Sequence, residues 1–167
     1  MLLAGGHAAQ NERELRGYRF LWNGVQGAGD AVTFRDLSWH APFSALGVRI
    51  VGANSAAILV GLKGYQQVPC DCYIERVLVV ADRSGSIVFD IYRVPFASFP
   101  PQPAHSITPL EIGRPKLEGQ QSSQDRALFG WSRALSSGDI LAYNVRSVSG
   151  GINAVTLSLF VNRNNQP

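Results

Sequence analysis

Glycine and proline recur so densely along this 167-residue chain that long helices are excluded. The 17 glycines and nine prolines leave no stretch longer than 15 residues free of both. Both residue types destabilise helix interiors, so neither a helical bundle nor a coiled coil is expected. The length suits one domain with a single core and an appendage, and it is too short for two domains with separate cores.

From residue 50 onward, short apolar runs alternate with turn residues, which is the pattern of β-strands. The runs at 73–81 and 87–93 flank Asp-Arg-Ser-Gly-Ser at 82–86, and this predicts a hairpin with its turn there. A second hairpin is expected within 56–68, and further strands at 128–133, 140–148 and 154–162. The six prolines of residues 94–124 predict a long surface excursion without a central strand.

Seven or eight short strands joined by long connections favour an all-β fold, an antiparallel two-sheet β-sandwich of jelly-roll type. We assign this sandwich to residues 46–167 and an extended N-terminal arm to residues 1–45, with a short helix at 7–16. The arm is too aromatic to stay soluble if exposed, so we expect it to dock on partner subunits. Its expected interface residues are Tyr18, Phe20, Trp22, Phe34, Trp39 and Phe43.

Charge argues against several classes of partner. Charged residues make up 16% of the chain and the net charge is +3, which is low for a solvated monomer and favours assembly. The two lysines, Lys63 and Lys116, lie far apart and the arginines are scattered, so no nucleic-acid partner is expected. No apolar run approaches the ~20 residues of a membrane span, and the first residues lack the pattern of a signal peptide. A cytosolic protein without a membrane partner is therefore expected.

Motifs for metal binding or catalysis are not evident. Cys70 and Cys72 would form a strained disulfide, and no second ligand cluster accompanies them, so we interpret them as small side chains at the start of a strand. The three histidines, His7, His40 and His105, stand apart from any nucleophile motif. We therefore predict no enzyme, no catalytic residue, no cofactor and no metal.

Asp90 is unusual because it lies inside an apolar strand, between Phe89 and Ile91. We interpret it as a buried or rim carboxylate that Arg93, Arg76 or a backbone N–H satisfies. A catalytic acid, a calcium ligand and a subunit contact are the alternatives. The other acidic residues are dispersed, so a polysaccharide-cleaving enzyme ranks last.

Aromatic residues divide into two groups. Tyr92, Phe129 and Trp131 are expected in the core, whereas Phe96 and Phe99 fall in the proline-rich excursion. Exposed aromatic rings dominate protein interfaces, and we favour that role. Stacking on sugar rings is the alternative, so Phe96 and Phe99 are the candidate glycan contacts.

Several segments together resemble a module of bacteriophage virion proteins, including tail-fibre and head-decoration components. They are LKGYQQVPCDCYI at 62–74, LVVADRSGSIVFDIYR at 78–93, FPP at 99–101, HSIT at 105–108, GW at 130–131, GDIL at 138–141 and VTLSLFV at 155–161. The resemblance spans about residues 57–163 and does not include the first 45. It implies a β-sandwich that assembles into the virion, often as a trimer, and it carries no catalytic residues.

This resemblance leads to the expected function, a non-enzymatic virion structural protein that acts as a capsid decoration or cement protein or as a head fibre. The alternative is a carbohydrate-binding receptor module, or a tail or adaptor component of the virion. Expected partners are further copies in a homotrimer, the major capsid protein or other virion proteins, and in the alternative host surface polysaccharide. The expected locations are the virion and, during assembly, the host cytoplasm.

Overall fold

The computed structural model describes residues 12–15, 18–21, 43–53 and 56–163, and the chain divides into two units, Met1–Pro42 and Phe43–Pro167. In the first unit, β1 (Glu12–Leu15) pairs antiparallel with β2 (Tyr18–Leu21). The helix predicted at 7–16 is wrong for residues 12–15, which form β1.

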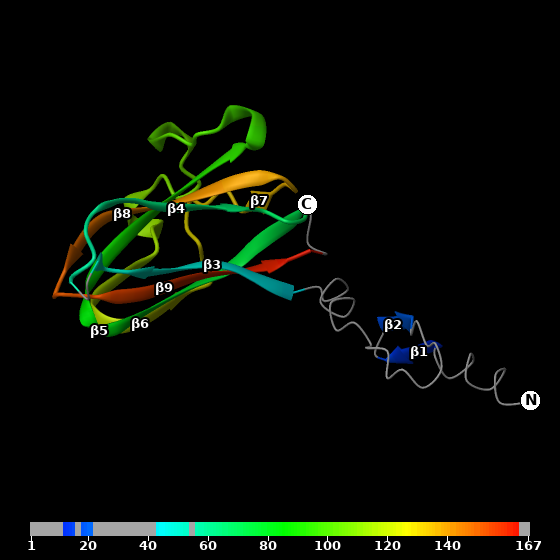
Figure 1. The fold of residues 1–167 in the computed structure, drawn as a ribbon, viewed down its shortest axis with the longest axis horizontal. Coiled ribbons are helices and arrows are strands. Elements are labelled where there is room, and N and C mark those ends of the chain that lie inside the picture. The colour runs from blue at the N-terminus through cyan, green and yellow to red at the C-terminus, as the bar shows by residue number, and fades with distance from the viewer. Residues whose placement is uncertain (1–11, 16–17, 22–42, 54–55, 164–167) are drawn as a thin grey trace, which may run out of the picture. The chain divides into compact units, whose positions relative to one another are not determined.

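The second unit is one antiparallel sheet, which confirms the all-β prediction. Its strands are β3 (Phe43–Val51), β4 (Gly61–Gln67), β5 (Cys72–Pro95), β6 (Lys116–Asp125), β7 (Ala134–Leu135), β8 (Asp139–Ser149) and β9 (Ala154–Asn162). Neighbouring strands follow the order β3-β9-β5-β8-β4, and β6 and β7 also pair with β5 (Figure 1). Within the described residues, no helix is long and apolar enough to cross a membrane.

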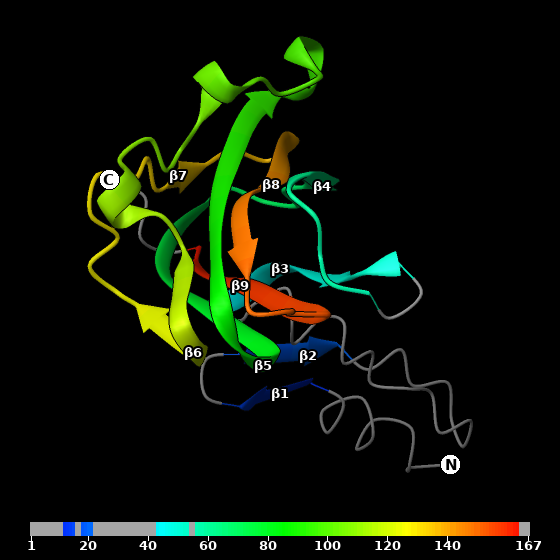
Figure 2. The same cartoon turned by 90° about the vertical axis from the view of Figure 1, so that its left-hand side faces the viewer.

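The 24-residue strand β5 determines the architecture because its two halves have different partners. Residues 73–81 pair with β9, whereas residues 86–95 pair with β8. Strand β6 runs beside both halves, and its register shifts between Val80 and Gly85. The predicted hairpin is therefore wrong: residues 82–85 form a bend, from which the halves diverge into different layers (Figures 1 and 2).

Local contacts hold this bend in place. A Cβ atom on Gly85 would lie 2.7 Å from the carbonyl oxygen of Ser149, so only glycine fits without a shift in the backbone. The backbone N–H groups of Ala154 and Asn153 donate to the Asp82 carboxylate at 3.0 and 3.1 Å, and they lower the pKa of Asp82. The bend is thereby tied to the start of β9.

Both halves of β5 contribute to a single hydrophobic core. Alternate residues of each half point inward, as the two-residue period of a strand requires, apart from the register shift between Ile74 and Arg76. The buried side chains include Ile74, Val77 and Val79 from the first half, Ile87, Phe89 and Ile91 from the second, Leu157 and Leu159 from β9, and Leu141 and Tyr143 from β8. The sheet therefore curls so that its two ends cover the same core.

The proline-rich excursion is confirmed only in part. Residues 96–115 contain three single-turn 3-10 helices, η2 (Phe96–Ser98), η3 (Pro103–His105) and η4 (Glu111–Gly113). The rest of the predicted excursion is wrong, because β6 pairs with β5. The strand predicted at 128–133 is also wrong, and β7 follows that stretch. The hairpin predicted within 56–68 is the single strand β4, which has a register shift between Leu62 and Gly64.

Candidate functional site

Asp90 is buried and fully engaged by three side chains. Its Oδ1 accepts hydrogen bonds from the hydroxyls of Ser106 at 2.5 Å and Thr108 at 2.9 Å. Its Oδ2 lies 3.2 Å from Nη2 of Arg114. Asp90 is 2% exposed, and burying a carboxylate is costly unless it is paired and hydrogen-bonded, as it is here.

These partners attach the excursion to β5. Thr108 Oγ1 also accepts the N–H of Ile91, and Arg114 Nε donates to the carbonyl of Thr108. Of the two predicted positions for Asp90, buried and rim, the structure shows the buried one, but both predicted arginine partners are wrong. Nε of Arg93 instead lies 3.8 Å from Oδ2 of Asp139, and Nη1 of Arg76 donates a hydrogen bond to Oε1 of Gln124. With both oxygens engaged, the Asp90 carboxylate acts as a structural staple between two segments.

The candidate glycan contacts are exposed. Phe96 is 73% exposed and Phe99 is 48% exposed, and the Phe99 ring meets the ring of Tyr65 edge-on at a centroid distance of 4.9 Å. Tyr65 comes from β4 and Phe99 from the turn after η2, so a strand and the excursion form this aromatic pair together. The flat faces of such a pair can pack against an apolar or sugar surface.

The six interface candidates of the arm fall in different parts of the chain. Phe43 begins β3 and is 62% exposed. Tyr18 and Phe20 lie in β2. Trp22, Phe34 and Trp39 lie outside the described residues. Phe43 therefore belongs to the sheet of the second unit, and the predicted arm boundary at residue 45 lies inside β3.

Further exposed apolar side chains were not predicted. Val51, Leu59, Val60 and Leu62 surround the β3–β4 connection, and we call them the β3–β4 apolar patch. Val51 and Leu59 help to line a cavity of about 260 Å³ there. The apolar run 56–60 was the only sequence signal, and it was assigned to the hairpin expected within 56–68.

Phe129 corrects one core prediction. It is 63% exposed, although Tyr92 and Trp131 are buried as predicted. Leu110 and Ile112, on the excursion, are also exposed. Gly130 has a φ of +74°, and a Cβ atom there would lie 2.5 Å from Leu110 Cδ1. This glycine lets Leu110 pack over the backbone beside Phe129.

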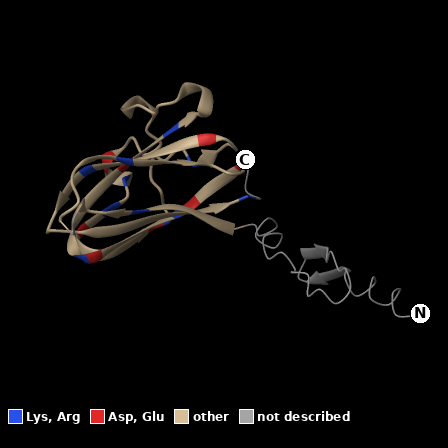
Figure 3. Ribbon diagram, viewed as in Figure 1, with Lys and Arg blue, Asp and Glu red and all other residues tan. Residues whose placement is uncertain are grey.

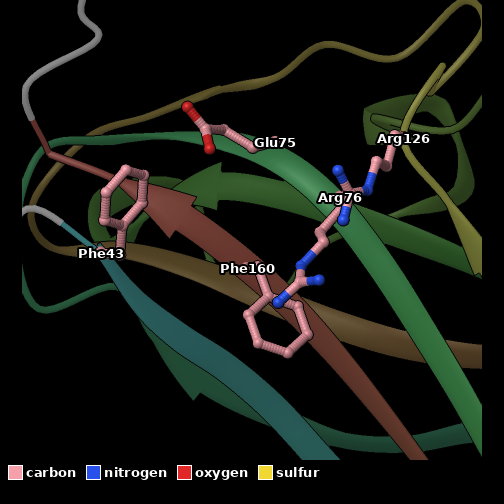
Figure 4. A pocket seen from close by; sticks show the side chains of 5 residues that line it. All are labelled: Phe43, Glu75, Arg76, Arg126 and Phe160. Carbon is pink, nitrogen blue, oxygen red and sulfur yellow. The ribbon is translucent and has the colours of Figure 1, made fainter.

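A cavity of about 340 Å³ is lined by residues from three strands and a loop. Its lining residues are Phe43 on β3, Glu75 and Arg76 on β5, Arg126 after β6 and Phe160 on β9 (Figure 4). We call it the arginine pocket. The register of β5 against β9 shifts between Ile74 and Arg76, and this places Arg76 opposite Phe160. Asp125 accepts the N–H groups of Ala127 and Leu128, which turns the chain at Arg126.

The side chains at the arginine pocket are held by their neighbours. Cζ of Arg76 lies 3.8 Å from the centroid of the Phe160 ring, a cation–π geometry, and its Nη1 donates to Gln124 at 3.3 Å. Glu75 accepts a hydrogen bond from Asn162 at 2.8 Å. No sequence motif indicates this site, because its members are up to 117 residues apart in the chain. Figure 3 shows the other charged residues of the second unit spread over its strands and loops.

Both cysteines are free thiols with different environments. Cys72 is buried and Cys70 is half-buried. Burial, together with the neighbouring Cys70, raises the pKa of the Cys72 thiol to about 12. Within the described residues, no three His, Cys, Asp or Glu side chains are grouped to hold a metal ion.

We expect the two thiols to react at very different rates in the native protein. The thiolate is the reactive form, so Cys72 should react with Ellman's reagent at pH 8 on the order of a hundredfold more slowly than Cys70. Cys70→Ser should remove the fast phase, and Cys72→Ser the slow one. Denaturant should make both thiols react at similar rates. Equal rates in the native protein would contradict the burial of Cys72.

Comparison with known proteins provides no family assignment. No protein-family model matches the chain, and no curated protein matches it. The crystal structure of a serine protease of Aeromonas sobria is similar over 71% of this chain, with 11% identity and a TM-score of 0.30. The chain spans 27% of the length of that protease chain. At this score the likeness carries no argument about fold or activity.

Proposed function

We propose that this chain is a non-enzymatic structural protein of a bacteriophage virion, a capsid decoration or cement protein or a head fibre. The observation that carries the proposal is the apolar character of a surface with few charges. Among the described residues, twelve large apolar side chains are exposed. Single exposed apolar residues are ordinary, but contiguous groups mark interaction sites. The resemblance of residues 57–163 to virion modules supports the same class of function.

The exposed groups lie at separate places on the sheet. The β3–β4 apolar patch lies at one connection, the Tyr65–Phe99 pair involves β4 and the excursion, and Leu110 and Phe129 lie beside Gly130. Burial of apolar area contributes about 25 cal/mol per Å². Several small contacts repeated around a symmetric shell gain further strength from multivalency. Such a surface suits a subunit that contacts several neighbours, which we propose are further copies in a homotrimer and the major capsid protein or other virion proteins.

The proposal includes the finer fold assignment, a two-sheet sandwich of jelly-roll type preceded by a docking arm. The curled sheet supports it, because β5 passes from the layer of β3 and β9 to the layer of β8 and β4. The staple at Asp90 supports a structural role for the most unusual carboxylate of the chain. We propose the virion as the site of function and the host cytoplasm as the site of assembly.

Purified particles of the phage that encodes this chain provide the test. Mass spectrometry should detect the chain in many copies per particle, and particles from a deletion strain should lose their contents at a lower temperature. Complementation with Leu59→Asp should reduce incorporation several-fold, because Leu59 is 74% exposed and its replacement leaves the core intact. Gln120→Asp, at an exposed polar position, is the matched control and should incorporate normally. Absence of the chain from particles would overturn the proposal.

The Tyr65–Phe99 pair favours a second candidate, a carbohydrate-binding receptor module on the tail or head fibre. Aromatic faces stack on sugar rings, and both rings are about half exposed. A glycan array probed with the full chain tests this candidate. Glycan binding that is lost in Phe99→Ala and kept in Phe129→Ala would support this candidate. If no glycan on the array binds the chain, the candidate is rejected.

A further inference from the structure

We propose that the arginine pocket binds a sugar that carries a carboxylate, of the hexuronate class. The inference goes beyond assembly and uses a site separate from the Tyr65–Phe99 pair. It rests on three features of the five lining residues: two arginine side chains without an acidic partner among the residues that the structure describes, an aromatic ring that fixes one of them, and an exposed ring at the opposite end (Figure 4).

The positive charge of the pocket is available to a ligand. Arg76 donates to a neutral amide, Gln124, and within the part of the chain that the structure describes neither Arg76 nor Arg126 forms an ion pair. Glu75 accepts from Asn162, so the three ionisable side chains of the pocket sum to +1. Guanidinium groups present planar pairs of N–H donors that match the two oxygens of a carboxylate.

Arg76 is held in position before any ligand arrives. The ring of Phe160 lies against its guanidinium group, and the hydrogen bond to Gln124 fixes one of its nitrogens. A long side chain ordered in this way loses little conformational entropy when it binds an anion. Arg126 is exposed and can approach the same anion from the end of β6.

The volume of the pocket and the aromatic side chain at its rim favour a small ring compound as the ligand. A volume of about 340 Å³ lies at the lower end of the range for small-molecule pockets. Phe160 is occupied by Arg76, whereas Phe43 exposes 62% of its surface and offers a face on which a sugar ring can stack. In Figure 4, Glu75 and Phe43 lie at the end of the pocket opposite Arg126, so a sugar with its carboxylate at the arginines would place its ring near Phe43.

The test is a titration of the full chain with glucuronate, followed by amide chemical shifts. Saturable binding of glucuronate is expected. Acetate supplies only the carboxylate and glucose only the sugar ring, so each should bind at least tenfold more weakly. An acidic oligosaccharide that ends in glucuronate distinguishes two sources of the ligand. If the natural ligand is a polymer end, the oligosaccharide should bind with the affinity of the free sugar; if only the free acid fits the pocket, it should not bind. Binding of glucuronate should weaken as the salt concentration rises.

Matched variants locate the site. Arg126→Gln should weaken glucuronate binding at least tenfold, whereas Arg49→Gln should not, because Arg49 is exposed on β3 and does not line the pocket. Phe43→Leu should reduce the preference for glucuronate over acetate. Neither arginine variant removes a described contact, so both should fold. No saturable binding by the wild type, equal binding of acetate, or equal loss in both arginine variants would overturn the proposal.

Discussion

Replacement of Asp90 by alanine is expected to lower the free energy of unfolding by about 3–5 kcal/mol, the usual cost of removing one partner of a buried ion pair. The side chain of Arg114 is 14% exposed and would keep its charge without the carboxylate. The hydroxyls of Ser106 and Thr108 would lose their acceptor in the same step. Urea denaturation of the full chain, followed by tryptophan fluorescence, measures the loss.

Three variants control for other causes. Glu118→Ala removes the surface pair with Lys116 and should cost less than about 1 kcal/mol, because exposed ion pairs contribute little. Asp90→Asn keeps an oxygen as hydrogen-bond acceptor, so its free energy of unfolding should fall by less than that of Asp90→Ala. The double variant Asp90→Ala/Arg114→Ala should lose less than the sum of its single variants, since the two side chains interact. Additive losses would contradict the staple.

Local periodicity predicted the strands but not their partners. In residues 154–162 the alternation of Val155, Leu157 and Leu159 with smaller residues predicts a strand with one buried face, and β9 has this form. The residues 82–86 are equally suitable for a hairpin turn and for a bend within one strand. The choice between turn and bend depends on pairing with β8 and β9, which lie more than 50 residues further along the chain. No local pattern contains that information.

The candidate sites show the same division. The position of Asp90 inside an apolar strand predicts a carboxylate that needs partners. The two-residue period places it on the face opposite Phe89 and Ile91, so the sequence left both a buried and a rim position open. Its partners come from residues 106–114, where the prolines give no periodic pattern. Phe129 lies in a short apolar run that resembles a strand, but Gly130 with its positive φ turns the chain and leaves the ring exposed. The arginine pocket requires the register shift in β5, which the sequence does not reveal.

Replacement of Phe89 by alanine is expected to cost about 3–5 kcal/mol, because the ring is fully buried and its removal leaves a cavity in the core. Phe96→Ala is the matched control, one residue beyond the end of the same strand and 73% exposed, and it should change stability by less than about 0.5 kcal/mol. Leu157→Ala, on β9 in the other layer, should cost about 2–5 kcal/mol.

If the two halves of β5 cover one core, the protein must unfold in a single cooperative transition, because neither layer can unfold while the other keeps its buried face. Phe89→Ala and Leu157→Ala must then each lower the midpoint of that one transition. Tryptophan fluorescence and far-ultraviolet circular dichroism should then give the same midpoint for each variant. Two separate transitions, or a loss in Phe89→Ala as small as that in Phe96→Ala, would show that the layers fold independently. In that case the bend at 82–85 would be a linker between two sheets, and the single-core architecture would be wrong.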